Sequence, residues 1–252
     1  MSSLSVGARY LERDATVEER RGNELIFELE QVCPYLHDRT SLLPLRFQMV
    51  PVSGPAFDQC LAAGDRRTGH YLYRTQCPTC RECEPIRVTV QAFERTRSQQ
   101  RVWNRGERLM TMRMGAPIVD DRRVQLFNAH RNQRGLNQPK TEFGETDYQQ
   151  FLLETCCDTM ALDFYLKDEL VAVAICDRGA QAWSAVYTFF DPQFGHLSPG
   201  TYSILKQIDL CREFGVTWLY LGFYIEDCRH MQYKQVYRPN ERLIEGQWTK
   251  FD

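Results

Sequence analysis

The sequence predicts a mixed fold of the α+β class, with strands and helices in separate runs rather than in strict alternation. Three apolar segments between residues 161 and 190 are separated only by short polar turns and are typical of consecutive strands. An amphipathic helix at 201–214 and a strand at 217–222 follow them. The N-terminal half carries shorter strands around a cysteine loop. We therefore predict an N-terminal domain over residues 1–115 and a C-terminal domain over residues 116–252.

The N-terminal elements are short. Residues 46–50 have strand character, and residues 57–63 predict a helix that Gly64 ends. Residues 70–76 are aromatic, and residues 85–90 alternate between apolar and polar side chains. Both segments predict strands, and the loop between them holds three of the ten cysteines.

Cys77, Cys80 and Cys83 recur at every third residue, and Pro78 excludes a regular helix at this point. Such spacing turns sulfurs toward one point, as zinc sites and iron–sulfur clusters require. With Cys33 as a fourth thiolate, the sequence predicts a zinc or iron–sulfur site. The alternative is that these thiols are reduced and stabilise the loop, or that one of them is redox-active. The other six cysteines are expected to be small buried apolar residues.

Positive charge is concentrated between Arg66 and Arg113. This stretch has eleven arginines, no lysine and four acidic residues, in a chain with a formal net charge of −2. Part of it, residues 98–110, predicts a helix with arginines along one face. The concentration indicates a polyanionic partner for this region, although the pI of about 6.2 argues against a general nucleic-acid coat.

The C-terminal half begins with helical patterns at 120–134 and 147–156, ahead of the three strands. A meander of strands, then a helix, then a strand is the order found in the acetyltransferase-like (GNAT) fold, which is an analogy of fold only. The phosphate-cradling loop that coenzyme A needs is missing before the helix, where the chain reads Gly195-His-Leu-Ser-Pro-Gly-Thr201. We therefore expect a GNAT-like domain that does not use acetyl-CoA.

Targeting signals are absent from the sequence. No apolar run approaches the roughly 18–20 residues that span a bilayer, and the first ten residues lack the pattern of a secretory signal. Ten cysteines without an export signal argue for reduced thiols or metal ligands rather than disulfides. We expect a cytoplasmic protein without a membrane or DNA partner.

Together these segments resemble the aminoacyl-tRNA–protein transferases of the N-degron pathway, from about Cys33 to Pro239. The N-terminal motifs are Cys33-Pro-Tyr-Leu36, Arg66-Arg-Thr-Gly69, the run from Tyr73 through the three cysteines to Arg87, and Phe93-x4-Ser98-Gln-x-Arg101. The C-terminal motifs are Ser184-x-Val-Tyr-Thr-Phe-Phe-Asp-Pro192, Ser198-Pro-Gly-Thr-Tyr202, Tyr220-Leu-Gly-Phe-Tyr-Ile225, and Cys228-x2-Met-Gln-Tyr-Lys234 ahead of Arg238-Pro239. One motif alone would be weak, but the whole set in this order is specific.

The resemblance implies transfer of an amino acid from aminoacyl-tRNA to the α-amine of proteins that begin with Asp or Glu, which marks them for degradation. The chain lacks the Cys-x-x-Cys of the arginyl branch, because Leu36 stands at the second position. The triple-cysteine run is more similar to the bacterial leucyltransferase branch. We favour leucine as the donor amino acid, and arginine is the alternative.

Site residues follow from these motifs and from the needs of the reaction, which are positioning, proton removal and oxyanion stabilisation. Candidate catalytic residues are Tyr187, Asp191, Tyr202, Tyr233 and Lys234. Candidate substrate-binding residues are Arg66, Arg67, Ser198 and Tyr224. Candidate tRNA-binding residues are Arg97, Ser98, Arg101, Trp103 and Arg105. The alternative is a structural role, with the tyrosines packed in the core and Asp191 in a turn. The five histidines show no metal-ligand spacing and are each expected at the surface or satisfied by one hydrogen bond.

Three other classes remain open at this point. A non-catalytic, metal-dependent RNA-binding module would not depend on residues 233–234. A coenzyme A acyltransferase is disfavoured by the missing loop. A purely redox iron–sulfur protein would leave the second half of the chain without a role.

Overall fold

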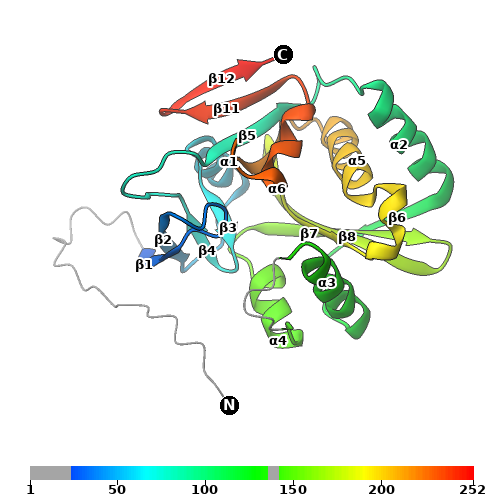
Figure 1. Ribbon diagram of the computed structural model, residues 1–252, viewed down its shortest axis with the longest axis horizontal. Coiled ribbons are helices and arrows are strands. Elements are labelled where there is room, and N and C mark those ends of the chain that lie inside the picture. The colour runs from blue at the N-terminus through cyan, green and yellow to red at the C-terminus, as the bar shows by residue number, and fades with distance from the viewer. Residues whose placement is uncertain (1–23, 136–141) are drawn as a thin grey trace.

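The computed structural model describes residues 24–135 and 142–252, which form two β-sheets with helices packed around the larger sheet (Figure 1). The smaller, antiparallel sheet has the order β1-β2-β4-β3. Its strands are β1 (Glu24–Val32), β2 (Thr40–Gln48), β3 (Arg66–Thr68) and β4 (Tyr71–Tyr73). Helix α1 (Gly54–Ala62) lies between β2 and β3 in the chain and ends before Gly64, whose φ of 94° suits glycine.

The larger sheet has eight strands in the order β12-β11-β5-β10-β9-β8-β7-β6. Its strands are β5 (Glu84–Thr89), β6 (Met110–Gly115), β7 (Asp158–Leu166), β8 (Glu169–Arg178), β9 (Ala182–Phe190), β10 (Trp218–Tyr224), β11 (Asn240–Ile244) and β12 (Gln247–Phe251). Neighbours are antiparallel except β9 and β10, which pair in parallel over only three residues of each strand. Because β5 and β6 precede residue 116, the two predicted domains share this sheet, and the predicted boundary is not a break in it.

Helices cover both faces of the larger sheet. On one face lie α2 (Arg97–Leu109) and α5 (Pro199–Glu213), and on the other lie α3 (Asp121–Gln133) and α4 (Glu145–Tyr148), which continues into a π-turn η1 (Gln149–Leu153) (Figure 1). Strand β7 shows why both faces are covered. Leu162 and Phe164 pack with α5 on one face of the sheet. Ala161 points to the other face and packs with α3, so the strand is apolar on both sides.

A close approach of α2 and α5 depends on Gly106. A Cβ atom at this position would lie 2.2 Å from the Tyr202 ring, far inside van der Waals contact. Helix α2 begins with a capping box, in which the Thr96 side chain and Gln99 satisfy each other's backbone N–H groups. The cap fixes where the arginine-rich helix begins, and the glycine fixes how closely it packs.

The predicted elements are confirmed for the most part. Every helix and strand named from the sequence is present, with ends moved by a few residues, and the three cysteines lie in the loop between β4 and β5 as expected. Strands β1, β3, β6, β11 and β12 were not predicted. The mixed class is confirmed by the two sheets and their helices, and the GNAT assignment remains a prediction.

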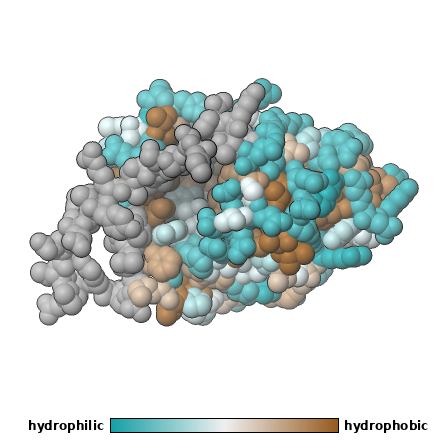
Figure 2. Space-filling view, turned by 90° about the horizontal axis from the view of Figure 1, so that it is seen from below, coloured by the Kyte–Doolittle hydropathy of each residue, from teal (hydrophilic) through white to brown (hydrophobic). Residues whose placement is uncertain are grey.

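The surface of the described residues carries its apolar side chains in small groups. Figure 2 shows the face seen from below, where hydrophilic residues surround scattered hydrophobic ones. No helix among the described residues combines the length and the apolar character needed to cross a membrane.

Candidate functional site

A bulge in β10 holds two buried cations. The pairing register of β10 with β5 shifts between Tyr220 and Phe223, and Gly222 between them has a φ of 84°, which favours glycine. The carbonyl groups released there accept side-chain hydrogen bonds. Arg66 of β3 donates to the Gly222 oxygen at 2.9 Å, and the Lys234 ammonium donates to the Phe223 oxygen at 2.6 Å. The bulge therefore brings residues 66 and 234 to one place.

Neither cation forms an ion pair with a carboxylate in the described part of the chain. Arg66 and Lys234 are each only 5% exposed, and the Arg66 Nε atom has no hydrogen-bond partner there. The adjacent acid, Asp65, already pairs with Arg46 at 2.6 Å and Arg74 at 3.0 Å. Buried charges are costly unless they are paired. Two such cations side by side indicate a site that receives an anion.

Burial and positive neighbours lower the proton affinity of this site. Burial lowers the pKa of Lys234 to about 7, and Arg66 and Arg134 act in the same direction, while Cys228 and Cys83 oppose them. Burial also lowers the pKa of Arg66 to about 10. We call Arg66, Arg134 and Lys234 the cationic cluster. An arriving carboxylate would favour the charged form of each member.

Two tyrosines border the cationic cluster. Tyr187 lies in β9, beyond the short stretch that pairs with β10, and Tyr233 opens the 3-10 turn η3 (Tyr233–Val236). Burial raises the pKa of both hydroxyls, and Arg134 at the end of α3 opposes this for both. Arg134 therefore lies near Tyr187, Tyr233 and Lys234 together. Four predicted site residues, Arg66 included, converge here from β3, β9 and η3.

Two predicted site residues have other partners. Arg67 neighbours Arg66 on a strand but its guanidinium lies in a fully buried ion pair with Asp177, at 2.7 Å. We correct its predicted role from substrate binding to structure. Asp191 accepts the backbone N–H of Gln193 at 3.1 Å as the cap of the turn η2 (Pro192–Leu197), and pairs with Arg122 at 3.2 Å. Its predicted role in holding the attacking amine stays a prediction.

The remaining predicted residues of the C-terminal half are also structural. Tyr202 is 1% exposed and donates to Glu107 at 2.7 Å, beneath α2. Tyr224 is buried under the Arg242 guanidinium, which lies 3.7 Å from its ring centre. Ser198 has a left-handed backbone with φ 58° at the start of α5, and its carbonyl accepts the first helical hydrogen bond from Tyr202. These contacts place all three outside the cationic cluster.

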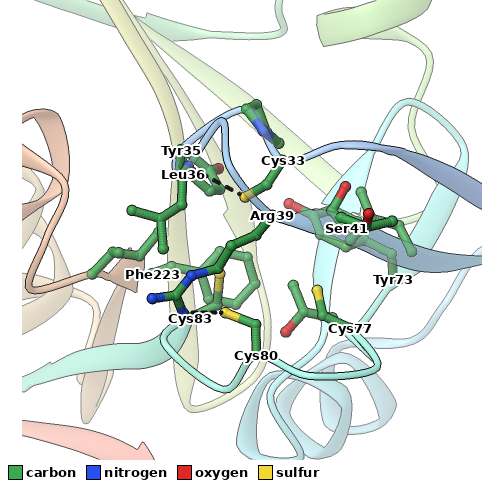
Figure 3. Close-up of a pocket in the computed structure, with 15 residues that line it drawn as sticks. Cys33, Tyr35, Leu36, Arg39, Ser41, Tyr73, Cys77, Cys80, Cys83 and Phe223 are labelled. Carbon is green, nitrogen blue, oxygen red and sulfur yellow. Dashed lines mark hydrogen bonds between the residues drawn. The ribbon is translucent and has the colours of Figure 1, made fainter.

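The four cysteines of the predicted metal site line one pocket. Figure 3 shows Cys33, Cys77, Cys80 and Cys83 around a common space. The cavity has a volume of about 50 Å³. The Leu36 backbone N–H donates to the Cys33 sulfur at 3.4 Å. Burial raises the pKa of Cys83 to about 12, and repulsion from the neighbouring thiols acts in the same direction. In residues 24–135 and 142–252, no three Cys, His, Asp or Glu side chains are spaced to hold a metal ion.

The donor chemistry of this pocket nevertheless fits a soft metal. Its sulfurs are free thiols, and the Arg39 guanidinium donates to the Cys80 sulfur at 3.2 Å. Hydrogen bonds and a nearby cation favour thiolates, which are the form that binds zinc and iron. The pocket also contacts the cationic cluster, because Phe223 lines it and the Lys234 ammonium binds the Phe223 carbonyl.

Helix α2 presents the predicted basic face. Arg97, Ser98 and Arg101 are exposed, and neither arginine has an acidic partner among the described residues. Arg105 is half-buried and donates to the His196 carbonyl at 2.7 Å. Trp103 is half-buried and packs against the core, with the Arg95 guanidinium 3.8 Å and the Lys206 ammonium 4.9 Å from its ring centre. Its predicted stacking on a base stays a prediction.

Sequence reasoning missed two residues near the cluster. His130 is 3% exposed, its ring packs on Phe190 at 4.6 Å, and its Nδ1 atom has no partner in the described part of the chain. Burial, with Arg134, lowers its pKa to about 4, so it is neutral at pH 7. Because the ring also makes one hydrogen bond with the Phe190 backbone, the expectation of a histidine satisfied by one hydrogen bond agrees with this position. Arg134 follows an ordinary helical pattern, and nothing in the sequence distinguished it.

Comparison with known proteins identifies the family. Residues 31–101 match the family model described as "Arginine-tRNA-protein transferase, N terminus", and residues 122–244 match "Arginine-tRNA-protein transferase, C terminus". The chain is 34% identical to an aspartate/glutamate leucyltransferase of Chromobacterium violaceum, covering 86% of this chain and 89% of the relative. It is 36% identical to the one of Aeromonas salmonicida, covering 87% and 92%.

Likeness to solved structures is looser. FemX superposes with a TM-score of 0.44 at 10% identity, over 81% of this chain and 80% of FemX. The family follows from the sequence matches, which include all the motifs that carry the cationic cluster and the cysteine pocket. The chain belongs to the aminoacyl-tRNA–protein transferase family, and over most of its length it is similar to aspartate/glutamate leucyltransferases.

Proposed function

We propose that this protein transfers leucine from leucyl-tRNA to the α-amine of proteins whose first residue is Asp or Glu, a step of N-degron degradation in the cytoplasm. Leucyltransferase relatives of nearly the same length support the reaction. The structural observation that carries the proposal is the pair of buried cations, Arg66 and Lys234, without an acidic partner among the described residues. Such a pair suits the carboxylate of the acceptor's first side chain.

Acceptor selection follows from the charge of this pair. A carboxylate beside Arg66 and Lys234 gains two charge-assisted interactions in a site with little water, while a neutral side chain leaves both cations without a partner. Removing one partner of a buried charge pair costs about 2–5 kcal/mol, which corresponds to about 30-fold or more in affinity. This is enough to separate Asp and Glu from Asn, Gln and Ala.

The reaction itself balances without a covalent enzyme intermediate. The acceptor nitrogen attacks the ester carbonyl, a C–N bond forms, the C–O bond to the tRNA ribose breaks, and the proton lost by the amine is taken up as the ribose hydroxyl forms. An α-amine with a pKa near 7.7–8.0 is partly neutral at pH 7, so the ester is attacked without strong base catalysis. Tyr187 borders the cationic cluster, and we assign its hydroxyl to hydrogen-bond the reacting groups.

The charge around the site favours leucine over arginine as the donor. The main groups that shift the pKa values of Lys234, Tyr187 and Tyr233 are cations, tyrosine and cysteines, and no carboxylate is among them. A second guanidinium would be repelled by this neighbourhood, whereas an uncharged leucyl group would not.

Helix α2 supplies a surface for the donor tRNA. Arg97 and Arg101 are one turn apart and exposed, which suits phosphate contacts along an acceptor stem. Replacing both by Glu should weaken tRNA binding and lower the slope of log Kd against log salt by about 2. Arg229→Glu with Arg238→Glu is a charge-matched control. Unchanged binding of tRNA to the α2 variant at low salt contradicts this placement.

We also propose that Cys33, Cys77, Cys80 and Cys83 hold zinc or an iron–sulfur cluster. The shared pocket and the hydrogen bonds to sulfur support this assignment. A bound metal would crosslink the loop after β1 to the loop before β5, and so stabilise the N-terminal half. Cys80→Ser should lower the metal content measured by elemental analysis and the melting temperature, whereas Cys60→Ser should change neither. Equal metal content in both variants would contradict a metal site at these four cysteines.

The function is tested by a transfer assay. Purified protein is supplied with labelled leucyl-tRNA or arginyl-tRNA and with peptides that begin with Asp, Glu, Asn or Ala. We expect leucine on the Asp and Glu peptides alone, and loss of at least 30-fold in kcat/KM for Lys234→Met. Lys250→Met, an exposed lysine of β12, is the matched control. Transfer of arginine would support the same enzyme class but contradict leucine as the donor amino acid. No transfer from either tRNA would contradict the proposed function.

A further inference from the structure

The turn η3 exposes two apolar side chains beside the cationic cluster. Tyr233 is 45% exposed and Val236 is 50% exposed, while Lys234 between them is 5% exposed. One short turn therefore carries a buried member of the cluster and a half-exposed tyrosine whose ring centre lies 5.8 Å from the Lys234 ammonium. A half-exposed aromatic ring next to unpaired cations is the arrangement that binds single-stranded nucleic acid by stacking and charge.

The turn is joined directly to the arginine-rich helix. The Gln99 amide of α2 donates to the Val236 carbonyl at 3.2 Å, and Gln99 is itself 4% exposed. Arg97 and Arg101, the exposed cations of α2, flank this contact in sequence. In Figure 1, α6 (Arg229–Gln232), which leads into η3, lies between β5 and α5. The turn therefore contacts α2 at Val236 and the cationic cluster at Tyr233 and Lys234.

A further cation lies at the end of the turn that borders the cationic cluster. Arg134 lies near the Tyr233 hydroxyl and the Lys234 ammonium, and it pairs with no carboxylate in the described ranges. Tyr233 and Val236 are three residues apart in a 3-10 turn, or about 6 Å along its axis, which is about the rise of two stacked nucleotides. The dimensions therefore suit the last nucleotides of one RNA strand.

We propose that Tyr233 is the stacking platform for the single-stranded 3′ end of the donor tRNA, with Val236 as its apolar rim and Arg134 as a phosphate contact. This inference rests on the proposed function and refines the sequence-based prediction that Tyr233 is catalytic. The unpaired 3′ nucleotides pack on the Tyr233 ring, and their esterified end reaches the bound acceptor amine near Lys234. Stacking needs the ring of Tyr233 and not its hydroxyl.

The test is a binding experiment with full-length protein and acceptor-stem RNA hairpins that either carry or lack the unpaired 3′ nucleotides. Wild type should bind the tailed hairpin more tightly than the blunt one. Tyr233→Ala should weaken binding of the tailed hairpin by about 5- to 100-fold, as expected for one lost base–aromatic stack, and leave the blunt hairpin unchanged. Tyr233→Phe should bind like wild type. Phe214→Ala, another exposed aromatic residue, is the matched control and should bind both hairpins normally.

Kinetics separate a platform from a catalytic hydroxyl. Tyr233→Ala should raise KM for leucyl-tRNA and leave KM for the acceptor peptide and kcat at saturating tRNA unchanged. A fall in kcat for Tyr233→Phe with normal binding of the tailed hairpin overturns the inference in favour of catalysis. Equal binding of both hairpins by wild type overturns it as well, even where leucine transfer is observed and the proposed function stands. If leucine is not transferred but binding still depends on the unpaired tail, the proposed function is refuted and Tyr233 as a stacking platform is supported.

Discussion

Replacing Lys234 by methionine is predicted to stabilise the fold below neutral pH while abolishing transfer. The folded-state pKa of Lys234 is lowered from 10.5 to about 7, by burial first and then by Arg66 and Arg134, with Cys228 and Cys83 opposing. A lowered folded pKa means that the folded protein binds the proton less well than the unfolded chain. The cost is therefore complete below pH 7, falls as the pH rises, and is gone above 10.5.

The size of the effect follows from the same two values. At 1.36 kcal/mol for each pH unit, protonated Lys234 costs the fold about 5 kcal/mol below pH 7. Methionine removes this cost but leaves the Phe223 carbonyl without its donor, which costs about 1–3 kcal/mol. The variant should therefore gain about 2–4 kcal/mol at pH 6, and at pH 10 it should be equal to wild type or less stable by up to about 2 kcal/mol.

Urea unfolding followed by tryptophan fluorescence at pH 6, 8 and 10 measures this change, with Lys250→Met as the matched surface control. The sign of the difference should reverse between pH 6 and pH 10 for position 234 and should stay near zero for position 250. A Lys234→Met variant that is destabilised equally at every pH would show that the lysine is charged and well paired in the fold. That result would refute the buried-cation argument and the anion site built on it.

Three further changes probe the frame that holds the site. Gly106→Ala should lower stability by about 1–3 kcal/mol or more, because the new methyl group overlaps the Tyr202 ring, and a melting temperature within one degree of wild type would contradict this. Asp177→Asn should lower the free energy of unfolding in urea by about 3–5 kcal/mol, because it leaves Arg67 buried and unpaired. The double variant Asp177→Leu with Arg67→Met should recover most of this loss. Asp120→Ala removes the N-cap of α3 and should cost about 1–2 kcal/mol, whereas Asp120→Ser should retain most of the stability.

The central strands could be predicted because their sequences are unambiguous. Residues 169–178 form an almost continuous apolar run, as expected of a strand covered on both faces, and they form β8. Strands β3 and β6 gave no such signal. Each is short and takes part in a sheet because a neighbouring strand offers hydrogen bonds, which sequence periodicity does not report.

The site was predictable only where a motif named the residue. Lys234 was selected from its motif, and the structure places it beside the β10 bulge. Arg66 and Arg67 could not be distinguished in sequence, because adjacent residues of a strand point to opposite faces and the partner of Arg67 lies 110 residues away. Arg134 could not be found at all, since its importance comes from its electrostatic effect on Tyr187, Tyr233 and Lys234, which are distant in sequence.

The place of β5 in the larger sheet has a consequence for how the chain acquires its fold. This strand is bordered by β10 and β11, which begin about 130 and 150 residues after it. At about 5–20 residues per second, a nascent chain carries β5 for roughly 6–26 seconds before either neighbour exists. An unpaired strand of this kind is a template for aggregation. Chains that lack the last dozen residues would keep one of these edges open permanently, and such truncations should collect in insoluble material even though the cationic cluster is complete.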